Sequence, residues 1–430
     1  RLMELALCAL AFVVMLVVGV PIAIAIGLVA TAALLTRIPV DAALATSAQR
    51  IAAGMDSTTL LAIPLFLLAG QLASRGGMAN HLVDLARALL GRIPGALAGV
   101  NVLAAMLFGA ISGSAVASAS AVGSLMDPRM RAEGYSKGFT TAVNVSAATT
   151  GLIIPPSNVL IVYSLASGGI SIAALFLAGY VPGILLGGAL LLAAGLGARR
   201  DLAAATSPPA PPRLGGALHA ALPGLGLPVL IIGGIASGLF TATESAAIAA
   251  VYALGVGLLT RTLSLPELPR VFRDSALTTG VVMLIIGTSM GLAWVLAHAG
   301  VPQALGEWLL GLSKNPIVVL LVINAALLVV GTVLDITPAI LIFTPILLPA
   351  VTQLGIDPVH FGIIMVMNLC IGLCTPPVGS VLFVGCGVSG ARIGEVVRPL
   401  LPLYAVMVAV LLGVTLWPPL SLALPRALGY

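Results

Sequence analysis

The scarcity of charged side chains constrains this chain more than any other feature of its sequence. Only 8% of the 430 residues are Asp, Glu, Lys or Arg, and 60% are hydrophobic, whereas a soluble domain carries roughly 25% charged residues. A chain with so few charges cannot build a surface that is compatible with water, so its outer solvent must be lipid. The sequence therefore predicts an integral membrane protein that resides in a lipid bilayer.

Long apolar segments recur along the chain at the length of membrane helices. A helix needs about 20 apolar residues to cross the hydrocarbon core, whereas a membrane β-barrel would show short alternating strands. We therefore expect an all-α polytopic membrane protein with about ten transmembrane helices. The spans are predicted at residues 2–18, 20–36, 58–74, 138–164, 172–198, 217–237, 239–259, 275–297, 361–385 and 399–417.

Two further apolar stretches, residues 94–127 and 316–349, differ from the spans. Each carries small or polar residues at its centre, in GAISGSAVASASAVG (Gly109–Gly123) and GTVLDITPAILIFTP (Gly331–Pro345). Each is shorter than the roughly 40 residues that two crossings require, so we predict two re-entrant helical hairpins. A polar tip at membrane depth must be buried in protein or must face a water-filled cavity.

A span with paired prolines follows each hairpin, and both are predicted to be broken helices (residues 138–164 and 361–385). The prolines lie in GLIIPPSN (Gly151–Asn158) and GLCTPPVG (Gly372–Gly379). Proline lacks the backbone donor and excludes the preceding helical turn. Two in succession leave carbonyl oxygens unpaired at mid-membrane, where a bound cation is a suitable partner.

The hairpin and the broken span recur at a constant offset of 221 residues. Six identities fall in register, including Pro155 and Pro156 with Pro376 and Pro377, and Ser114 aligns with Asp335. Internal repeats are typical of secondary transporters. We therefore predict a first repeat at residues 1–200, a proline-rich cytoplasmic linker at 201–216 and a second repeat at 217–430.

The distribution of basic residues predicts that the two repeats are inverted. The loop after the first hairpin contains Arg129, Arg131 and Lys137, whereas the matching loop, residues 350–360, contains no Lys or Arg. Cytoplasmic loops collect these residues. If sides alternate from an outside N-terminus, 14 of the 19 Lys and Arg residues fall in cytoplasmic loops. Both termini are then predicted to lie outside the cytoplasm, on the periplasmic side.

Asp335 is the most informative polar residue, because an intramembrane carboxylate is costly and is by default functional. It is expected to be a Na⁺ ligand, a cap for the following helix, or both. Ser112 and Ser114 are expected to bind an ion or solute, whereas Ser118 and Ser120 are expected to permit helix packing. Asn144 and Asn158 could contact solute or a neighbouring helix. Glu244 is expected to cap a helix or to bridge to another domain, which are both structural roles.

Several function classes are disfavoured by residues that the sequence lacks. His81, His219, His298 and His360 all lie near predicted loops, so an intramembrane enzyme would lack a base beside Asp335. The four cysteines lie in apolar segments and are expected to be buried thiols. No basic run with interleaved aromatic residues indicates nucleic-acid binding. Re-entrant hairpins also occur in ion channels, but inverted broken helices favour a transporter that works by alternating access.

These motifs resemble the large permease subunit of TRAP (tripartite ATP-independent periplasmic) transporters, the DctM-like family. The resemblance covers nearly the whole chain and many motifs in order. They include GVPIAIAIG (Gly19–Gly27), IPLFLLAG (Ile63–Gly70), FGAISGSAVA (Phe108–Ala117), GYSKGF (Gly134–Phe139), IIPPSNVLIVY (Ile153–Tyr163), TATESAAIAA (Thr241–Ala250), LDITPAILIFTPILLP (Leu334–Pro349) and TPPVG (Thr375–Gly379).

The resemblance implies an elevator-type, Na⁺-coupled importer of organic acids in the bacterial inner membrane. The solute would be of the C4-dicarboxylate, keto acid, sugar acid or sialic acid type. A periplasmic substrate-binding protein would deliver it, and a small four-span membrane subunit, expected here as a separate chain, would be the constant partner. The alternative is a stand-alone Na⁺–anion carrier of similar inverted-repeat architecture.

The resemblance also implies which residues form the sites. The coupling ion, Na⁺, would bind at two places and no organic cofactor would be needed, and the solute would lie between the ions. One Na⁺ site would use Ser112, Ser114, Gly151 and Pro155, the other would use Gly331, Asp335, Thr337, Gly372 and Thr375, and the solute would contact Ser114, Asn158, Thr337 and Gly379.

Overall fold

The computed structural model describes residues 2–91, 95–201 and 211–430, and regular structure in these ranges is entirely helical. Short 3₁₀ turns η1 (Thr58–Leu61), η2 (Thr149–Leu152) and η3 (Leu265–Glu267) supplement the α-helices. The α-helices are α1 (Leu2–Val17), α2 (Ile22–Leu35), α3 (Val40–Met55), α4 (Ala62–Arg75), α5 (Met78–Leu90), α6 (Ala96–Ser112), α7 (Ala115–Ala132), α8 (Lys137–Ala148), α9 (Asn158–Ala166), α10 (Ile172–Asp201), α11 (Leu214–Ala236), α12 (Ala242–Leu259), α13 (Leu268–His298), α14 (Val301–Leu312), α15 (Pro316–Gly331), α16 (Ile336–Gln353), α17 (Pro358–Gly372), α18 (Ser380–Ser389), α19 (Ile393–Leu416) and α20 (Pro419–Ala427).

The all-α polytopic prediction is confirmed. Seven helical segments of the described chain are long and apolar enough to cross a membrane. Large apolar side chains point outward from them, among them Leu192 (69% exposed), Val229 (71%) and Leu259 (86%). Lipid is the solvent in which such a surface is stable, because water would face contiguous apolar area. The sequence did not predict α3, because Asp41 and Arg50 lower its hydropathy below that of a span.

Both predicted hairpins are pairs of helices, and both extend beyond the predicted limits. The first consists of α6 and α7 and ends at Ala132, whereas the prediction stopped at residue 127; residue 94, its predicted start, lies outside the described ranges. The second consists of α15 and α16 and ends at Gln353, not at residue 349. The predicted ends fall just before Pro128 and at Pro349, but both prolines lie inside their helices, as neighbouring groups in membrane proteins permit.

Both spans with paired prolines are interrupted helices. The first runs as α8, η2 and α9, and the second as α17 and α18, so the helical parts span 137–166 and 358–389 rather than 138–164 and 361–385. The Pro155–Pro156 and Pro376–Pro377 peptide bonds are cis. Corresponding helices begin 221 residues apart: α7 and α16 at 115 and 336, α8 and α17 at 137 and 358, and α10 and α19 at 172 and 393.

The predicted linker, residues 201–216, is only partly described. Helix α10 continues to Asp201, residues 202–210 lie outside the described ranges, and α11 begins at Leu214. The carboxylate of Asp201 accepts hydrogen bonds from the backbone N–H and the hydroxyl of Ser136, both at 2.8 Å. The end of α10 is therefore attached to the start of α8.

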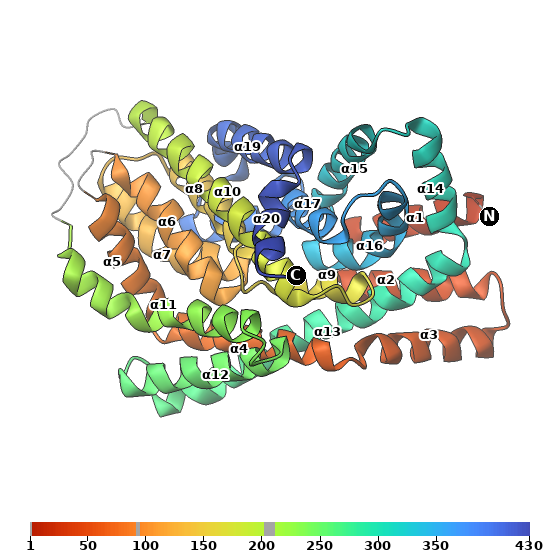
Figure 1. Cartoon of the computed structure of the whole chain (residues 1–430), viewed down its shortest axis with the longest axis horizontal. Helices are drawn as coiled ribbons and strands as arrows, with labels where there is room; N and C mark the ends of the chain where they lie inside the picture. Colours follow the sequence, from red (N-terminus) through yellow and green to blue (C-terminus); the bar gives the residue numbers. More distant parts are fainter. Residues whose placement is uncertain (1, 92–94, 202–210) are drawn as a thin grey trace.

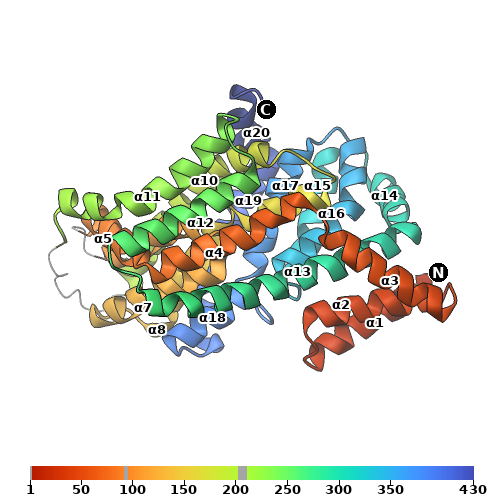
Figure 2. The ribbon, with the colours of Figure 1, turned by 90° about the horizontal axis from the view of Figure 1, so that it is seen from below.

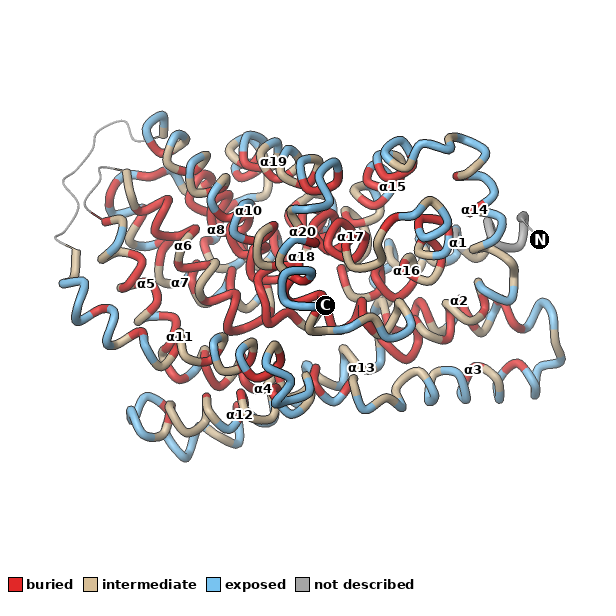
Figure 3. Tube along the Cα trace, viewed as in Figure 1, coloured by how far each residue is buried: buried red, intermediate tan, exposed pale blue. Residues whose placement is uncertain are grey.

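The helices form two packed groups. In one group α4 packs on α12 and α13, and α13 also packs on α2 and α3. These helices lie together along the lower side of Figure 1 and run side by side in Figure 2. The other group contains the hairpins and the interrupted helices; α7 packs on α18, and α16 packs on α9. Each hairpin therefore contacts the interrupted helix of the other half, and buried residues concentrate in this group (Figure 3).

Pairs of glycines set how closely each hairpin approaches the interrupted helix of its own half. A Cβ atom placed on Gly109 of α6 would lie 2.3 Å from Cα of Gly151. A Cβ atom on Gly372 of α17 would lie 2.6 Å from Cα of Gly331. Only a residue without a side chain permits backbones to approach this closely. The glycine pairs therefore determine where the hairpin tips lie.

This close approach predicts that Gly109→Ala destabilises the protein. The added methyl group must displace backbone rather than a flexible side chain, and overpacking of this kind costs about 1–3 kcal/mol. The matched control is Gly188→Ala at an exposed position of α10, where a Cβ atom would meet nothing within 4 Å. Thermal unfolding in detergent, followed by tryptophan fluorescence, should show a lower midpoint for Gly109→Ala only. Equal midpoints for both variants would contradict the conclusion that the close approach of Gly109 and Gly151 requires glycine.

Candidate functional site

The tip of the first hairpin is a tight turn between two helices. Ser112 ends α6, Gly113 adopts a left-handed conformation (φ +58°), and Ser114 is the N-cap of α7. The Ser114 hydroxyl accepts a hydrogen bond from the backbone N–H of Ala117 (3.3 Å), which fixes the start of α7. Ser112 is 3% exposed, and its Oγ lies 3.5 Å from the Ser114 nitrogen. The two predicted serines therefore form one unit.

This tip lies against the break in the first interrupted helix. A Cβ atom on Gly113 would lie 3.1 Å from the Pro156 carbonyl oxygen and 3.5 Å from Nδ2 of Asn158. The hydroxyl of Ser157 donates to the Leu152 carbonyl and closes the break. Among the described residues, Asn158 Oδ1 is a buried acceptor without a hydrogen-bond partner. The tip and the break thus meet at the Asn158 side chain, which can still accept a hydrogen bond.

The tip of the second hairpin lies against the second break in the same way. Asp335 occupies the N-cap position of α16, and its Oδ1 accepts a hydrogen bond from the Ser380 hydroxyl (3.3 Å). The Val378 N–H donates to the Thr332 carbonyl (3.2 Å). Ser380 is the first residue of α18, and the sequence analysis did not predict its role. Its position directly after Gly379 was the available signal.

A cavity of about 140 Å³ lies at this second tip. It combines one carboxylate, two hydroxyl side chains and the backbone of the second hairpin tip and of the second break, and oxygen ligands of this type suit Na⁺. No Lys, Arg or His is among its walls, which are formed by the described residues Ile22, Gly331, Thr332, Val333, Leu334, Asp335, Leu373, Val378, Gly379 and Ser380.

The structure brings some of the predicted site residues together and separates others. Asp335, Gly331 and Gly379 line the cavity, and Gly372 meets Gly331 directly. Thr337 and Thr375 do not form its walls, and the Thr375 hydroxyl donates to the Ile371 carbonyl (2.9 Å). At the first tip, Gly151 meets Gly109, and Pro155 and Pro156 form the break itself.

Several polar residues have structural roles. Asn144 donates to the Ala119 carbonyl (2.8 Å), and buried Ser118 donates to the Ala105 carbonyl (3.3 Å), which confirms packing for Ser118. Glu244 forms a capping box with Thr241, as predicted. Packing was also expected for Ser120, but this residue is exposed on α7, so that prediction is wrong. The serine faces a groove that the sequence did not predict.

The groove lies between α4, α7 and α13 and has a volume of about 340 Å³. Its polar residues come from segments far apart in the chain, which explains why sequence patterns did not reveal it. At one end is the first hairpin tip, and at the other is Arg75, whose guanidinium lies 3.4 Å from the Asp274 carboxylate. The polar lining consists of Gln71, Ser74, Arg75, Ser112, Ser114, Ser120, Ser124 and Thr278.

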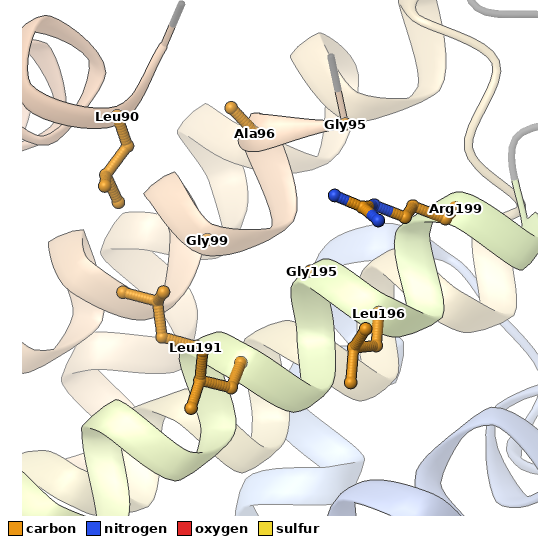
Figure 4. Close-up of a pocket in the computed structure, with 9 residues that line it drawn as sticks. Leu90, Gly95, Ala96, Gly99, Leu191, Gly195, Leu196 and Arg199 are labelled. Carbon is orange, nitrogen blue, oxygen red and sulfur yellow. The ribbon is translucent and has the colours of Figure 1, made fainter. Parts of the chain in front are cut away.

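Another cavity, of about 250 Å³, lies between α6 and α10 (Figure 4). Its walls are aliphatic side chains and glycines, with Arg199 as the one charged member of that lining. An apolar cavity offers no partner to the oxygens of a small anion. In addition, the described residues contain no group of three or more His, Cys, Asp or Glu that could hold a metal ion. This cavity is therefore a poorer candidate for an anionic solute than the two tips and the groove.

Comparison with known proteins identifies the family. The sequence profile of the DctM component of tripartite ATP-independent periplasmic transporters matches residues 9–420. The chain belongs to the TRAP transporter large-permease family. It is a multi-pass membrane protein of a transporter family, not an enzyme.

Individual relatives and one solved structure agree with this assignment. The chain is 52% identical over 419 residues to the uncharacterised protein YgiK of Salmonella typhimurium, covering 96% of this chain and 95% of YgiK. It is 44% identical to the C4-dicarboxylate TRAP transporter large permease DctM of Pseudomonas aeruginosa, covering 86% and 87% of the two chains. It is 40% identical to the isethionate TRAP transporter permease DctMQ of Oleidesulfovibrio alaskensis, covering 95% of this chain and 64% of DctMQ. The fold is similar to that of the Alcanivorax borkumensis YdaH transporter, with a TM-score of 0.65 at 15% identity and 87% and 88% coverage.

The contact between the first tip and the break predicts a selective effect of Gly113→Ala. Alanine in the left-handed conformation costs roughly 1–2 kcal/mol, and the methyl group would also crowd the Pro156 carbonyl. Gly390→Ala is the control, since Gly390 also has a positive φ (+67°) but its neighbour is the flexible Lys137 side chain. We expect similar losses of thermal stability but a much larger loss of solute uptake for Gly113→Ala. Comparable uptake in the two variants would argue against a functional tip.

Proposed function

We propose that this chain is the large membrane subunit of a Na⁺-coupled importer of organic anions that depends on a periplasmic binding protein. Membership of the family and the relatives named for C4-dicarboxylate and isethionate support an anionic organic solute. The observation that carries the ion coupling is the Asp335 carboxylate in a cavity whose described walls include no cationic side chain. Asp335 is half-buried; a charge that is withdrawn from water without a cationic partner is costly, and a bound cation would compensate it.

The second Na⁺ site is proposed at Asp335 with Ser380 and the backbone of the second hairpin tip and the second break. From the predicted set it retains Gly331, Gly372, Thr337 and Thr375, the last through its carbonyl, because the hydroxyl already donates to the Ile371 carbonyl of α17. The first site is proposed at the other tip, from Ser112, Ser114, Gly151 and Pro155. Carbonyl and hydroxyl oxygens at interrupted helices coordinate Na⁺ in secondary transporters.

The solute is proposed to bind between the ions, near Ser114, Asn158, Thr337 and Gly379. Helices α7 and α16 contain 18 residues each and begin at the two tips. Their N-terminal N–H groups and dipoles attract an anion. The unpaired Oδ1 of Asn158 could accept a hydrogen bond from a solute hydroxyl. Such a site binds cation and anion together without a buried basic side chain.

The transport movement is proposed to be an elevator motion of two inverted halves. The group of hairpins and interrupted helices would move against the group that contains α4, α12 and α13, and carry the site across the bilayer of the bacterial inner membrane. The recurring helix starts at an offset of 221 residues support the two halves. The basic loops support an orientation with both termini in the periplasm.

The partners are proposed to be a small four-span membrane subunit and a periplasmic substrate-binding protein. The 64% coverage of the isethionate permease DctMQ supports the first, because that relative has additional length beyond the part that matches this chain. The exposed apolar surface of α12, with Val251 (70% exposed) and Leu259 (86% exposed), is compatible with lipid or with a membrane partner.

Replacement of Asp335 by Asn tests the ion coupling. We expect NaCl, compared with KCl, to raise the melting temperature of the wild type, because a ligand that binds only the folded state stabilises it by about 1.4 kcal/mol at tenfold above its Kd. Asp335→Asn should lose much of this shift, and Na⁺-driven uptake of labelled succinate or isethionate into proteoliposomes with both partners should collapse. The control Asp41→Asn removes an exposed carboxylate at the start of α3 and should retain both.

Three results would contradict parts of this proposal. A Na⁺ shift that is unchanged in Asp335→Asn would exclude the second ion site. Uptake that is indifferent to Na⁺ would exclude the coupling. Uptake that persists without the binding protein would favour the stand-alone carrier.

A further inference from the structure

The groove between α4 and α7 begins at the first hairpin tip. Gly70 of α4 lies so close to the tip that a Cβ atom there would be 2.9 Å from the Ser112 carbonyl oxygen. From this contact α4 runs to Arg75, and α7 runs from Ala115 to Ala132. Helix α4 ends at Arg75 and α7 ends with Arg129 and Arg131 in its last turn, and the distribution of charges assigns both ends to the cytoplasmic side. The groove therefore joins the proposed solute site to that side.

The wall that α7 contributes carries serines along its length, interspersed with Val116, Ala117 and Ala121. Ser120 and Ser124 lie four residues apart, and both are exposed. Residues at this spacing share one face of a helix. Opposite them, α4 contributes Gln71, Ser74 and Arg75, and Thr278 of α13 completes the wall. An exposed face at a lipid boundary would be apolar, so a polar face indicates that water or a polar ligand fills the groove.

Arg75 gives the groove its charge. Its guanidinium lies 3.4 Å from Oδ2 of Asp274, and both side chains are substantially exposed (60% and 32%). The other oxygen, Oδ1, lies 3.2 Å from a guanidinium nitrogen of Arg273. Asp274 would thus keep a cationic partner if Arg75 left it. The three groups together carry one net positive charge at the mouth of the groove.

We propose that the groove is the release path of the solute and that Arg75 is its carboxylate-binding residue. This inference rests on the proposed function in that it takes the solute to be an organic anion. The guanidinium of Arg75 exchanges Asp274 for the solute, because arginine binds carboxylates and sulfonates through paired N–H donors. The serine hydroxyls of α7 and the side-chain amide of Gln71 on α4 supply further hydrogen bonds along the groove. The anion then leaves the tips through a chain of weak sites rather than through lipid.

The charge of the groove can be measured without knowing the solute. Ser120→Cys places a thiol inside the groove, and its modification by the anionic reagent 2-sulfonatoethyl methanethiosulfonate is compared with that by the cationic trimethylammonium analogue in non-ionic detergent. Labelling of the wild type, whose Cys370, Cys374 and Cys386 are buried, is subtracted. Charged clefts raise local ion concentrations and association rates by roughly tenfold or more. We expect the thiol introduced by Ser120→Cys to react faster with the anionic than with the cationic reagent, by a larger ratio than a free thiol in solution does. Adding Arg75→Gln should remove this preference.

The matched control is Arg270→Gln, which removes one exposed basic charge from the start of the neighbouring α13 and does not line the groove. In the Ser120→Cys background this change should leave the reagent preference largely intact. Succinate and isethionate, at constant ionic strength, should slow the anionic reagent in the presence of Arg75 and not in Arg75→Gln. Equal effects of the two arginine changes, or an inaccessible thiol at position 120, would overturn the proposal.

A transport arm distinguishes failure of this inference from failure of the proposed function. Arg75→Gln should reduce the rate of binding-protein-dependent uptake of succinate or isethionate, while the Na⁺-induced thermal shift stays unchanged. Arg75→Lys, which keeps the positive charge, should retain part of the uptake rate. Unchanged uptake in Arg75→Gln, beside loss of uptake in Asp335→Asn, would reject the release path alone. If neither anion is taken up or protects the thiol, the assignment to an organic-anion path is wrong as well.

Discussion

Unpaired backbone groups at membrane depth are the constraint on which the rest of this structure depends. An uninterrupted helix satisfies its own N–H and C=O groups, but each hairpin tip and each proline-containing break leaves several of them without a helical partner. Here a break lies beside each tip, and some of the groups pair across the gap, as Val378 does with Thr332. The backbone groups that do not pair across the gap lie, together with the side chains of Asp335, Ser380 and Asn158, where ions and solute are proposed to bind.

Close packing makes this arrangement possible. The glycine pairs Gly109–Gly151 and Gly331–Gly372 bring each hairpin against the interrupted helix of its own half, and the contacts α7–α18 and α16–α9 join the two halves. The tips are therefore held by packed helices rather than by flexible loops. This rigidity is compatible with a group of helices that moves as a body and carries the site with it.

The sequence predicts those features that violate the apolar pattern locally. Small and polar residues within apolar runs indicated both tips, paired prolines indicated both breaks, and a carboxylate in an apolar stretch indicated Asp335. Features that arise only when distant segments meet could not be predicted in this way. The groove combines Arg75 of α4 with Ser120 of α7, and Arg75 pairs with Asp274 of α13. Ser380 is likewise recognised as a site residue only from its hydrogen bond to Asp335. Helix α3, which packs on α13, was not predicted because its charged residues lower its hydropathy below that of a span.

The most direct test of the central claim is an electron cryo-microscopy map of the chain with its small partner in lipid nanodiscs, recorded in NaCl and in KCl. The account predicts density for an ion beside the Asp335 carboxylate in NaCl, bounded by Ser380 and by backbone carbonyls of the second break. A cavity that holds no ion in either salt, with the helix ends of the tip and break paired only to each other, would contradict it.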